Sequence, residues 1–329
     1  MLTELSPTIL KTGETMQVFR LEPPDDFAPK LVHFLRHKGE ESIRGIASRL
    51  AGKYLDCCQD YFYFGKINGQ MAGHVWFEYG RHDQPIADFG HVYTVPEQRG
   101  KGVASALLPY FRADFNASPA IAAFCSNSKE GIAAIYIRNG FRPILPGTKA
   151  GKLGMYKQYD GEDAFQRFTA DYYQGDADGI RLVPGTMEWK HELDCLLRFT
   201  GCARPRAFLS NMVGTYGKAV FYQEDNGGKA LTALTAEGRC VGWFFAIRPL
   251  YEPDAMPVFD WCLHPAFAAA EPRLLQEAAN MLAGPRPLGC WLTSNMPEKR
   301  VLLETLGFRE TAIIHDYQPG NDLLLLELK

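Results

Sequence analysis

One stretch, residues 91–108, constrains the fold of this chain more than any other. It combines an apolar strand pattern, a loop that contains Gly100 and Gly102, and an amphipathic helix pattern. Backbone N–H groups at a helix N-terminus, with the positive end of the helix dipole, bind phosphate groups. Glycine lacks a Cβ, so the loop can turn sharply and approach a ligand closely. Arg99 and Lys101 add positive charge, and the stretch therefore predicts a strand–loop–helix unit that holds a phosphate or pyrophosphate.

The glycine spacing distinguishes this loop from the commoner phosphate-binding loops. It has neither the G-x-G-x-x-G of dinucleotide-binding folds nor the G-x-x-x-x-G-K-[ST] of nucleotide triphosphatases. Arg99, Gly102 and Ala104 instead resemble the R/Q-x-x-G-x-G/A signature of the GNAT superfamily, the acyl-CoA-dependent N-acyltransferases. The resemblance implies that the loop binds the pyrophosphate of acetyl-CoA through Arg99, Gly100, Lys101, Gly102, Val103, Ala104 and Ser105.

A second block supports the same resemblance. An apolar run at residues 121–125 is followed by a helical pattern that carries Tyr136 and ends at Gly140-Phe141. Gly140 suits a helix C-cap before the next strand. This order of strand, helix and Gly-Phe resembles the second motif of the superfamily. It implies an α+β fold in which a mixed, mostly antiparallel central sheet is flanked by helices.

The second half of the chain repeats the first. Residues 68–76 resemble residues 237–245 at an offset of 169 (238 − 69), and Pro96 plus 169 falls on Pro265. A Gly-Phe pair near the end repeats the earlier one at an offset of 167 (308 − 141). Three landmarks in order at nearly one offset predict two tandem GNAT-fold domains. We expect them to span residues 1–175 and 176–329, with the boundary in the Gly/Asp-rich segment at Gly175.

The second copy lacks the residues that carry the chemistry. Its counterpart of the glycine loop, residues 268–273, contains no glycine. Pro272 removes an N–H donor, and Glu271 places a negative charge where the pyrophosphate would bind. Leu303 stands where the first copy has Tyr136. The second domain is therefore expected to keep the fold without binding acetyl-CoA, and packing, homodimer formation and shaping of the substrate cleft remain open as its role.

Composition argues against several classes of function. The formal net charge of the 329 residues is −3, which gives no general attraction to nucleic acid or to an anionic membrane. The sequence contains no run of about 18 apolar residues, so we expect no transmembrane helix. Eight cysteines are scattered without zinc-site spacing, so we expect no metal and a reduced, cytoplasmic protein. The N-terminal 15 residues are expected to precede the first strand, either disordered or draped over the core.

The reaction that the resemblance implies needs a proton acceptor for the attacking amine and a proton donor for the leaving thiolate. Tyr136, five residues before the Phe of Gly-Phe, matches the tyrosine acid of the superfamily. Asp88 is the first candidate for the base and His91 the second; Glu78 and His74 are weaker candidates. Strand alternation places Asp88 on one face with Gly90, Val92 and Thr94 and leaves His91 and Tyr93 on the other, unless a bulge interrupts the strand.

The superfamily also implies contacts to the pantetheine arm of acetyl-CoA. The arm pairs with the end of this strand, which here comprises Val92, Tyr93 and Thr94. Members often have an Asn seven residues before the tyrosine, but Lys129 stands at that position here. Asn127, two residues earlier, is the candidate for this contact.

The sequence thus favours an N-acetyltransferase that moves an acetyl group from acetyl-CoA to a primary amine of a small molecule. Glu78, Asp83 and Asp88 near the presumed cleft suit a cationic amine. Two alternatives stay open: an acyltransferase with another acyl donor or with a hydroxyl or carrier-bound acceptor, and a CoA-binding interaction module without turnover.

Overall fold

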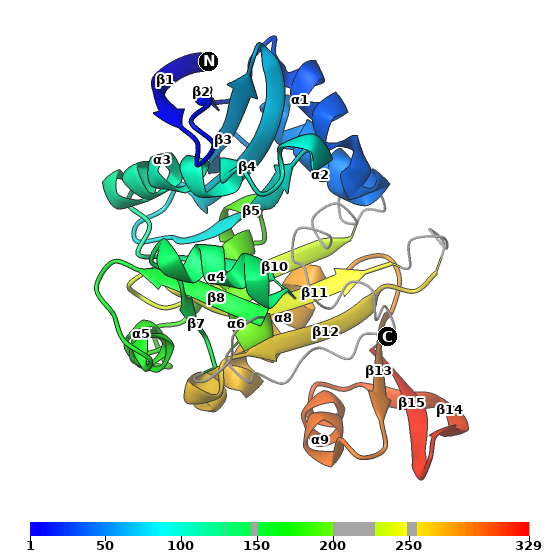
Figure 1. Cartoon of the computed structure of the whole chain (residues 1–329). Coiled ribbons are helices and arrows are strands. Elements are labelled where there is room, and N and C mark those ends of the chain that lie inside the picture. Colours follow the sequence, from blue (N-terminus) through cyan, green and yellow to red (C-terminus); the bar gives the residue numbers. More distant parts are fainter. Residues whose placement is uncertain (128, 146–150, 200–227, 249–254, 329) are drawn as a thin grey trace. The chain divides into compact units, whose positions relative to one another are not determined.

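The computed structural model describes the chain except for residues 128, 146–150, 200–227, 249–254 and 329 (Figure 1). It consists of two units, Met1–Phe168 and Thr169–Lys329. The division falls within α5 (Ala164–Tyr172), seven residues before Gly175, where the sequence places the boundary (175 − 168).

The first unit begins with two strands, which are followed by two helices and by three further strands before α3. Its elements are β1 (Leu2–Ile9), β2 (Thr15–Leu21), α1 (Ala28–Leu35), the 3-10 helix η1 (Arg36–Lys38), α2 (Glu40–Leu50), β3 (Cys58–Ile67), β4 (Gln70–Gly80), β5 (Ile86–Thr94), η2 (Pro96–Gln98), α3 (Val103–Ala117), β6 (Ala122–Asn127), α4 (Glu130–Arg138), β7 (Arg142–Pro143), β8 (Gly151–Tyr156) and most of α5.

The eight strands form one sheet in the order β1-β2-β3-β4-β5-β6-β8-β7. All neighbours in the described residues are antiparallel except β5 and β6, which are parallel. Antiparallel neighbours such as β3 and β4 can be joined by a short hairpin, whereas a parallel pair needs a crossover, which α3 supplies between β5 and β6. The mixed sheet flanked by helices confirms the fold class predicted from the sequence.

Helices cover both faces of this sheet, so its central strands are apolar on both sides. On one face Val75 and Phe77 of β4 pack with Leu107 and Phe111 of α3 in a large core. On the other face Trp76 packs in a smaller core beneath α1 and α2. Figure 1 shows α3 and the α1–α2 pair on these two sides of the sheet. Val75 and Trp76 point to opposite faces because successive side chains of a strand alternate between the two faces of the sheet.

The N-terminal segment corrects one expectation. Residues 2–9 form the edge strand β1 instead of a disordered or draped segment. Leu2 pairs with Leu21 and Ile9 with Thr15 across a tight hairpin, and Leu5 packs against the large core. Pairing with β1 gives hydrogen-bond partners to the peptide groups on the outer edge of β2. The composition of residues 2–9 does not reveal this stabilisation.

The second unit repeats this architecture without a counterpart of β1. Its described elements are β9 (Arg181–Pro184), η3 (Met187–Trp189), α6 (Lys190–Phe199), β10 (Lys229–Leu234), β11 (Cys240–Ile247), β12 (Val258–Leu263), η4 (Pro265–Ala270), α8 (Glu271–Leu282), β13 (Leu288–Thr293), α9 (Pro297–Thr305), β14 (Arg309–Gln318) and β15 (Asn321–Leu328). The sheet order β9-β10-β11-β12-β13-β15-β14 corresponds strand by strand to β2-β3-β4-β5-β6-β8-β7. The parallel pair, β12 with β13, also occupies the corresponding place, which confirms the predicted tandem folds.

Two further expectations concern cysteines and membranes. Seven cysteines are free thiols in the described residues, while Cys202 lies outside them. Within the described part of the chain, no helix is both long enough and apolar enough to cross a membrane.

Candidate functional site

The candidate site lies where β5 and β6 stop pairing. The parallel ladder joins Ile86 to Ala122 and ends at Asp88 and Phe124. Both strands continue past it, β5 to Thr94 and β6 to Asn127. A cavity of about 770 Å³ lies here, lined by residues of β5, the glycine loop, α3, β6 and α4. The edge of β5 that faces this cavity is thus available to a ligand.

The glycine loop forms part of the cavity lining. Gly100 and Gly102 both adopt left-handed φ angles, 80° and 90°, which favour glycine. Gly102 is the N-cap of α3, and the first backbone bond of that helix runs from Ala106 N to Gly102 O (2.9 Å). The N–H groups of the first turn therefore precede the intrahelical ladder. Gly100, Gly102, Val103, Ala104 and Ser105 line the cavity with the start of this helix.

Positive charge surrounds the cavity. Among the described residues that line it are five cationic side chains and no carboxylate; the cations are Lys11, Lys38, Arg99, Lys129 and Arg138. Arg99 is exposed and donates from Nε to the Thr94 carbonyl oxygen (3.3 Å). Burial lowers the pKa of Lys38. A cavity with orphan N–H donors and only cationic charge fits a polyanionic ligand such as the phosphates of CoA.

A β-bulge interrupts β5 and corrects the expected alternation. His74 pairs with Tyr93 and Trp76 with Gly90, so Val75 stands opposite two residues of β5. One of them, His91, has a φ of 49°. Its ring lies 4.9 Å from the Trp76 ring, on the face covered by α1 and α2.

Asp88 lies opposite Glu78 and therefore points to that same face, as does Tyr93. Val92 instead packs against the opposite core, with Phe89. The predicted grouping of Asp88 with Val92, apart from His91 and Tyr93, is thus wrong. The extra residue of the bulge shifts the two-residue period by one.

Tyr136 belongs to the same cavity lining as the glycine loop. It is a buried residue of α4 that lines the cavity, and its ring meets Phe89 of β5 edge to face at 5.5 Å. Its ring also lies 5.9 Å from that of Phe141, the Phe of Gly-Phe. These contacts hold the phenol beside the strand that carries the bulge.

Most of the residues predicted from the sequence meet in this cavity. Its lining includes Tyr136, His91, Val92, Tyr93, Thr94, Arg99, Gly100, Gly102, Val103, Ala104 and Ser105. Asp88 does not line it, and neither does Lys101, whose ammonium pairs with Glu14 at 3.0 Å. Asn127 belongs to β6, but its side chain lies outside the described residues.

The weaker candidates for the base are also outside the cavity lining. Glu78 is wholly buried and accepts hydrogen bonds from Arg49 of α2, which neutralises it. His74 is wholly buried, and burial lowers its pKa to about 3. Asp83 is exposed in the connection between β4 and β5. Glu78, Asp83 and Asp88 therefore do not give this cavity the acidic lining expected from the sequence.

Sequence reasoning missed several lining residues. Lys11 comes from the β1–β2 connection, Lys38 from η1, and Lys129 caps α4. Lys11 and Lys38 belong to no motif, because tertiary folding alone brings them to the loop and the strand, whereas Lys129 stands where the superfamily often has an Asn.

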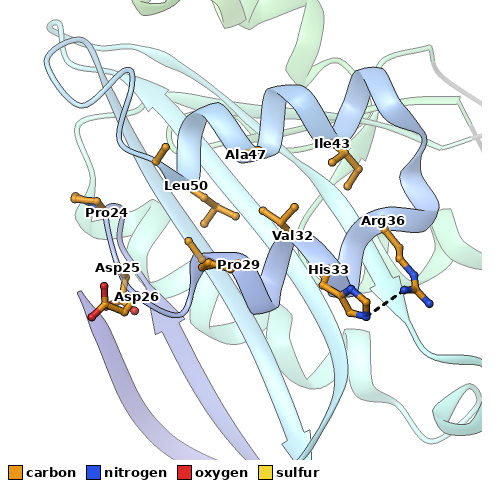
Figure 2. A pocket seen from close by; sticks show the side chains of 12 residues that line it. Pro24, Asp25, Asp26, Pro29, Val32, His33, Arg36, Ile43, Ala47 and Leu50 are labelled. Atoms are coloured by element: carbon orange, nitrogen blue, oxygen red, sulfur yellow. Dashed lines mark hydrogen bonds between the residues drawn. The ribbon is translucent and has the colours of Figure 1, made fainter.

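A second hollow, of about 860 Å³, lies between α1 and α2 (Figure 2). Its lining combines apolar side chains such as Val32, Ile43 and Leu50 with Asp25 and other polar residues. At one end the Arg36 guanidinium lies 3.2 Å from Nε2 of His33. The glycine loop and the residues predicted from the sequence are absent from its described lining, so the smaller cavity is the better candidate site.

The corresponding region of the second unit is built differently. There α8 starts after η4 without a glycine, and Glu271 at its start accepts a hydrogen bond from Trp261 Nε1 (2.6 Å). Asp260 of β12 forms a buried ion pair with Lys299 of α9. Leu303 is wholly buried in α9. An internal ion pair and a negative charge thus occupy a region that is cationic and hollow in the first unit.

Comparison with known proteins gives the following. Residues 31–141 match the family model of the acetyltransferase (GNAT) family, whereas no curated protein matches the chain. The solved structures to which the chain is similar include the following three. The GNAT domain of S. lividans PAT has 18% identity and a TM-score of 0.36, over 46% of this chain and 96% of that one. A Bacillus subtilis acetyltransferase in complex with CoA has 17% identity and a TM-score of 0.34, over 46% and 98%. A mutant spermidine N-acetyltransferase from Vibrio cholerae has 13% identity and a TM-score of 0.34, over 46% and 94%.

The matched residues run from α1 to the start of the strand after α4, and they contain the bulge, the glycine loop and Tyr136. The first unit of this chain therefore carries an acetyltransferase domain of the GNAT family.

Proposed function

We propose that the protein is an N-acetyltransferase that transfers the acetyl group of acetyl-CoA to the primary amine of a small molecule. The observation that carries the proposal is the cavity between β5, β6 and α3, which combines the glycine loop, five cations and Tyr136. This lining would hold the phosphates beside the glycine loop and the reacting groups beside Tyr136.

Acetyl-CoA supplies the activated acetyl group, and the residues of the chain position it. The N–H groups at the start of α3 and the side chains of Lys11 and Arg99 would hold the phosphates. The open edge of β5, from Gly90 to Thr94, would hydrogen-bond to the amide groups of the pantetheine arm as an added strand does.

Proton transfer is assigned to two side chains. Tyr136 would donate its phenolic proton to the sulfur as the C–S bond breaks and the new C–N bond forms. His91 would accept the proton that the amine loses; we prefer it to Asp88 because His91 lines the cavity and Asp88 does not. This scheme balances the protons and requires no metal ion.

The second unit is assigned a non-catalytic role in packing, in homodimer formation or in shaping the acceptor site. Its ion pair of Asp260 with Lys299 and its Leu303 support this assignment. A cytoplasmic location is part of the proposal, and the free thiols of the described cysteines are compatible with it.

The proposal is tested by measuring CoA release from acetyl-CoA with a panel of acceptors. The panel should include polyamines, amino acids, aminoglycosides, alcohols and amine-free controls. Acetylation of an amine, identified by mass spectrometry, supports the proposal. Turnover with alcohols alone would replace it by an O-acyltransferase, and binding without turnover on any acceptor would favour a CoA-binding interaction module.

A further inference from the structure

The bulge of β5 holds a residue in an unfavourable backbone conformation beside the candidate site. His91 has a φ of 49°, a left-handed angle that residues other than glycine rarely adopt. Such strain persists only where the surrounding structure enforces it. The contacts of the bulge therefore identify the residues that enforce the left-handed conformation of His91.

Two side chains bind the two carbonyl groups of the bulge. Nδ1 of His74, on β4, lies 3.1 Å from the carbonyl oxygen of His91. Nζ of Lys38, on η1, donates to the carbonyl oxygen of Val92 at the same distance. His74 is wholly buried and neutral, so it carries one ring proton, and a carbonyl partner requires that proton on Nδ1. Both bonds reach the bulge from the α1–α2 side of the sheet.

The second unit provides an internal comparison. Trp243 pairs with Cys262 and Phe245 with Asp260, so one residue of β11 faces one residue of β12 and no bulge forms. The position that corresponds to His74 at the offset of 169 is Trp243. The histidine is thus present in the copy with the bulge and absent from the copy whose corresponding strands pair without one.

We propose that His74 and Lys38 are positioning residues that hold the bulge in the shape to which the pantetheine arm of acetyl-CoA binds. The inference rests on the proposed function. With both carbonyls fixed by side chains, the peptide groups of His91 and Val92 keep one orientation toward the cavity. A flexible bulge would have to be ordered on binding, at a cost in affinity.

The test measures dissociation constants by calorimetry for acetyl-CoA and for S-acetylpantetheine, which lacks the phosphates. His74→Leu removes the donor, and His74→Asn keeps an N–H near the place of Nδ1. We expect His74→Leu and Lys38→Met to weaken both ligands by the same factor, about five- to tenfold. His74→Asn should stay within about threefold of the wild type. Arg99→Met is the matched control, because it should weaken acetyl-CoA and leave S-acetylpantetheine unchanged.

A further variant tests the role of strain. If His74 acts by holding the left-handed residue, His91→Gly in the His74→Leu background should restore S-acetylpantetheine binding, since glycine adopts this φ without strain. Failure of the glycine to restore binding would contradict the positioning role.

The outcomes separate this inference from the function on which it rests. If the wild type binds neither ligand, the proposed function fails. If the wild type binds and His74→Leu binds equally well, the inference fails while the function stands. A Lys38→Met effect confined to acetyl-CoA would make Lys38 a phosphate ligand and overturn its positioning role. If His74→Leu does not fold by circular dichroism, His74→Asn and Lys38→Met decide the result.

Discussion

At the scale of single residues, the proposal assigns to Tyr136 the proton that the leaving thiolate needs. Tyr136→Phe removes the phenolic proton and keeps the ring that packs against Phe89. We expect kcat for acetyl transfer to fall by about 100-fold, the lower range for loss of a general acid, with an unchanged dissociation constant for acetyl-CoA. Tyr110→Phe is the matched control, since that hydroxyl bonds the Ser6 carbonyl on the surface. Equal kcat values for the two variants would remove Tyr136 from the mechanism.

His74 gives the first unit a specific pH dependence. Its folded-state pKa is about 3, because burial disfavours the charged ring, against 6.5 for an exposed histidine. Between these values the unfolded chain binds the proton more strongly, so stability falls as the pH drops below about 6.5. The contribution of this group approaches about 1.4 kcal/mol per pH unit. Urea unfolding from pH 4 to 7 should therefore show a shallower dependence for His74→Asn, and parallel curves would contradict the assignment.

At the scale of elements, the contact between α3 and β4 positions the start of the helix. A Cβ on Gly73 would lie 2.5 Å from Val103 Cγ1 and 2.9 Å from the Tyr93 carbonyl oxygen. Gly73→Ala should therefore push α3 away from the sheet, lower the stability by about 1–3 kcal/mol and weaken acetyl-CoA binding. Gly131→Ala is the control, because it meets open space within α4 and should be neutral or slightly stabilising. Matching urea midpoints for the two variants would show that the contact is not required.

The elements also show where sequence reasoning succeeds and where it ends. The glycine loop and α3 were predictable because their conformation depends on neighbouring residues. A bulge in β5 was allowed for, but its position was not predictable, because no residue type marks His91 as the extra residue; pairing with β4 determines it. Lys38 and Lys11 reach the cavity through packing of α1 and of the β1–β2 connection, and these distant contacts leave no motif in the sequence.

At the scale of the whole molecule, the duplication was predictable because Pro265 and Phe308 repeat earlier landmarks at nearly one offset. The loss of the loop in the second copy was equally visible. The ion pair between Asp260 and Lys299 of the second unit could not be predicted. It joins residues that are 39 apart in sequence, so only the folded structure shows it. The role of this unit accordingly stays a proposal.

The ion pair allows the two units to be tested separately. Lys299→Met leaves the buried Asp260 carboxylate without its cation and should destabilise the second unit by about 3 kcal/mol. Every described residue that lines the cavity belongs to the first unit, so acetyl-CoA binding should not change. Replacing both charges, with Asp260→Asn added, should recover part of the stability. A Lys299→Met protein that remains folded but loses acetyl-CoA binding would show that the second unit contributes to the site.

The measurement that tests the central claim most directly is a calorimetric titration of the full chain with acetyl-CoA, beside the Gly102→Glu variant. The cavity predicts one site per chain, and binding should be lost in the variant, because glutamate cannot adopt the left-handed angle of Gly102 without strain and its charge repels the pyrophosphate. Two sites per chain would show that the second unit also binds the ligand. Equal binding by the wild type and by a folded Gly102→Glu variant would contradict the assignment of the glycine loop.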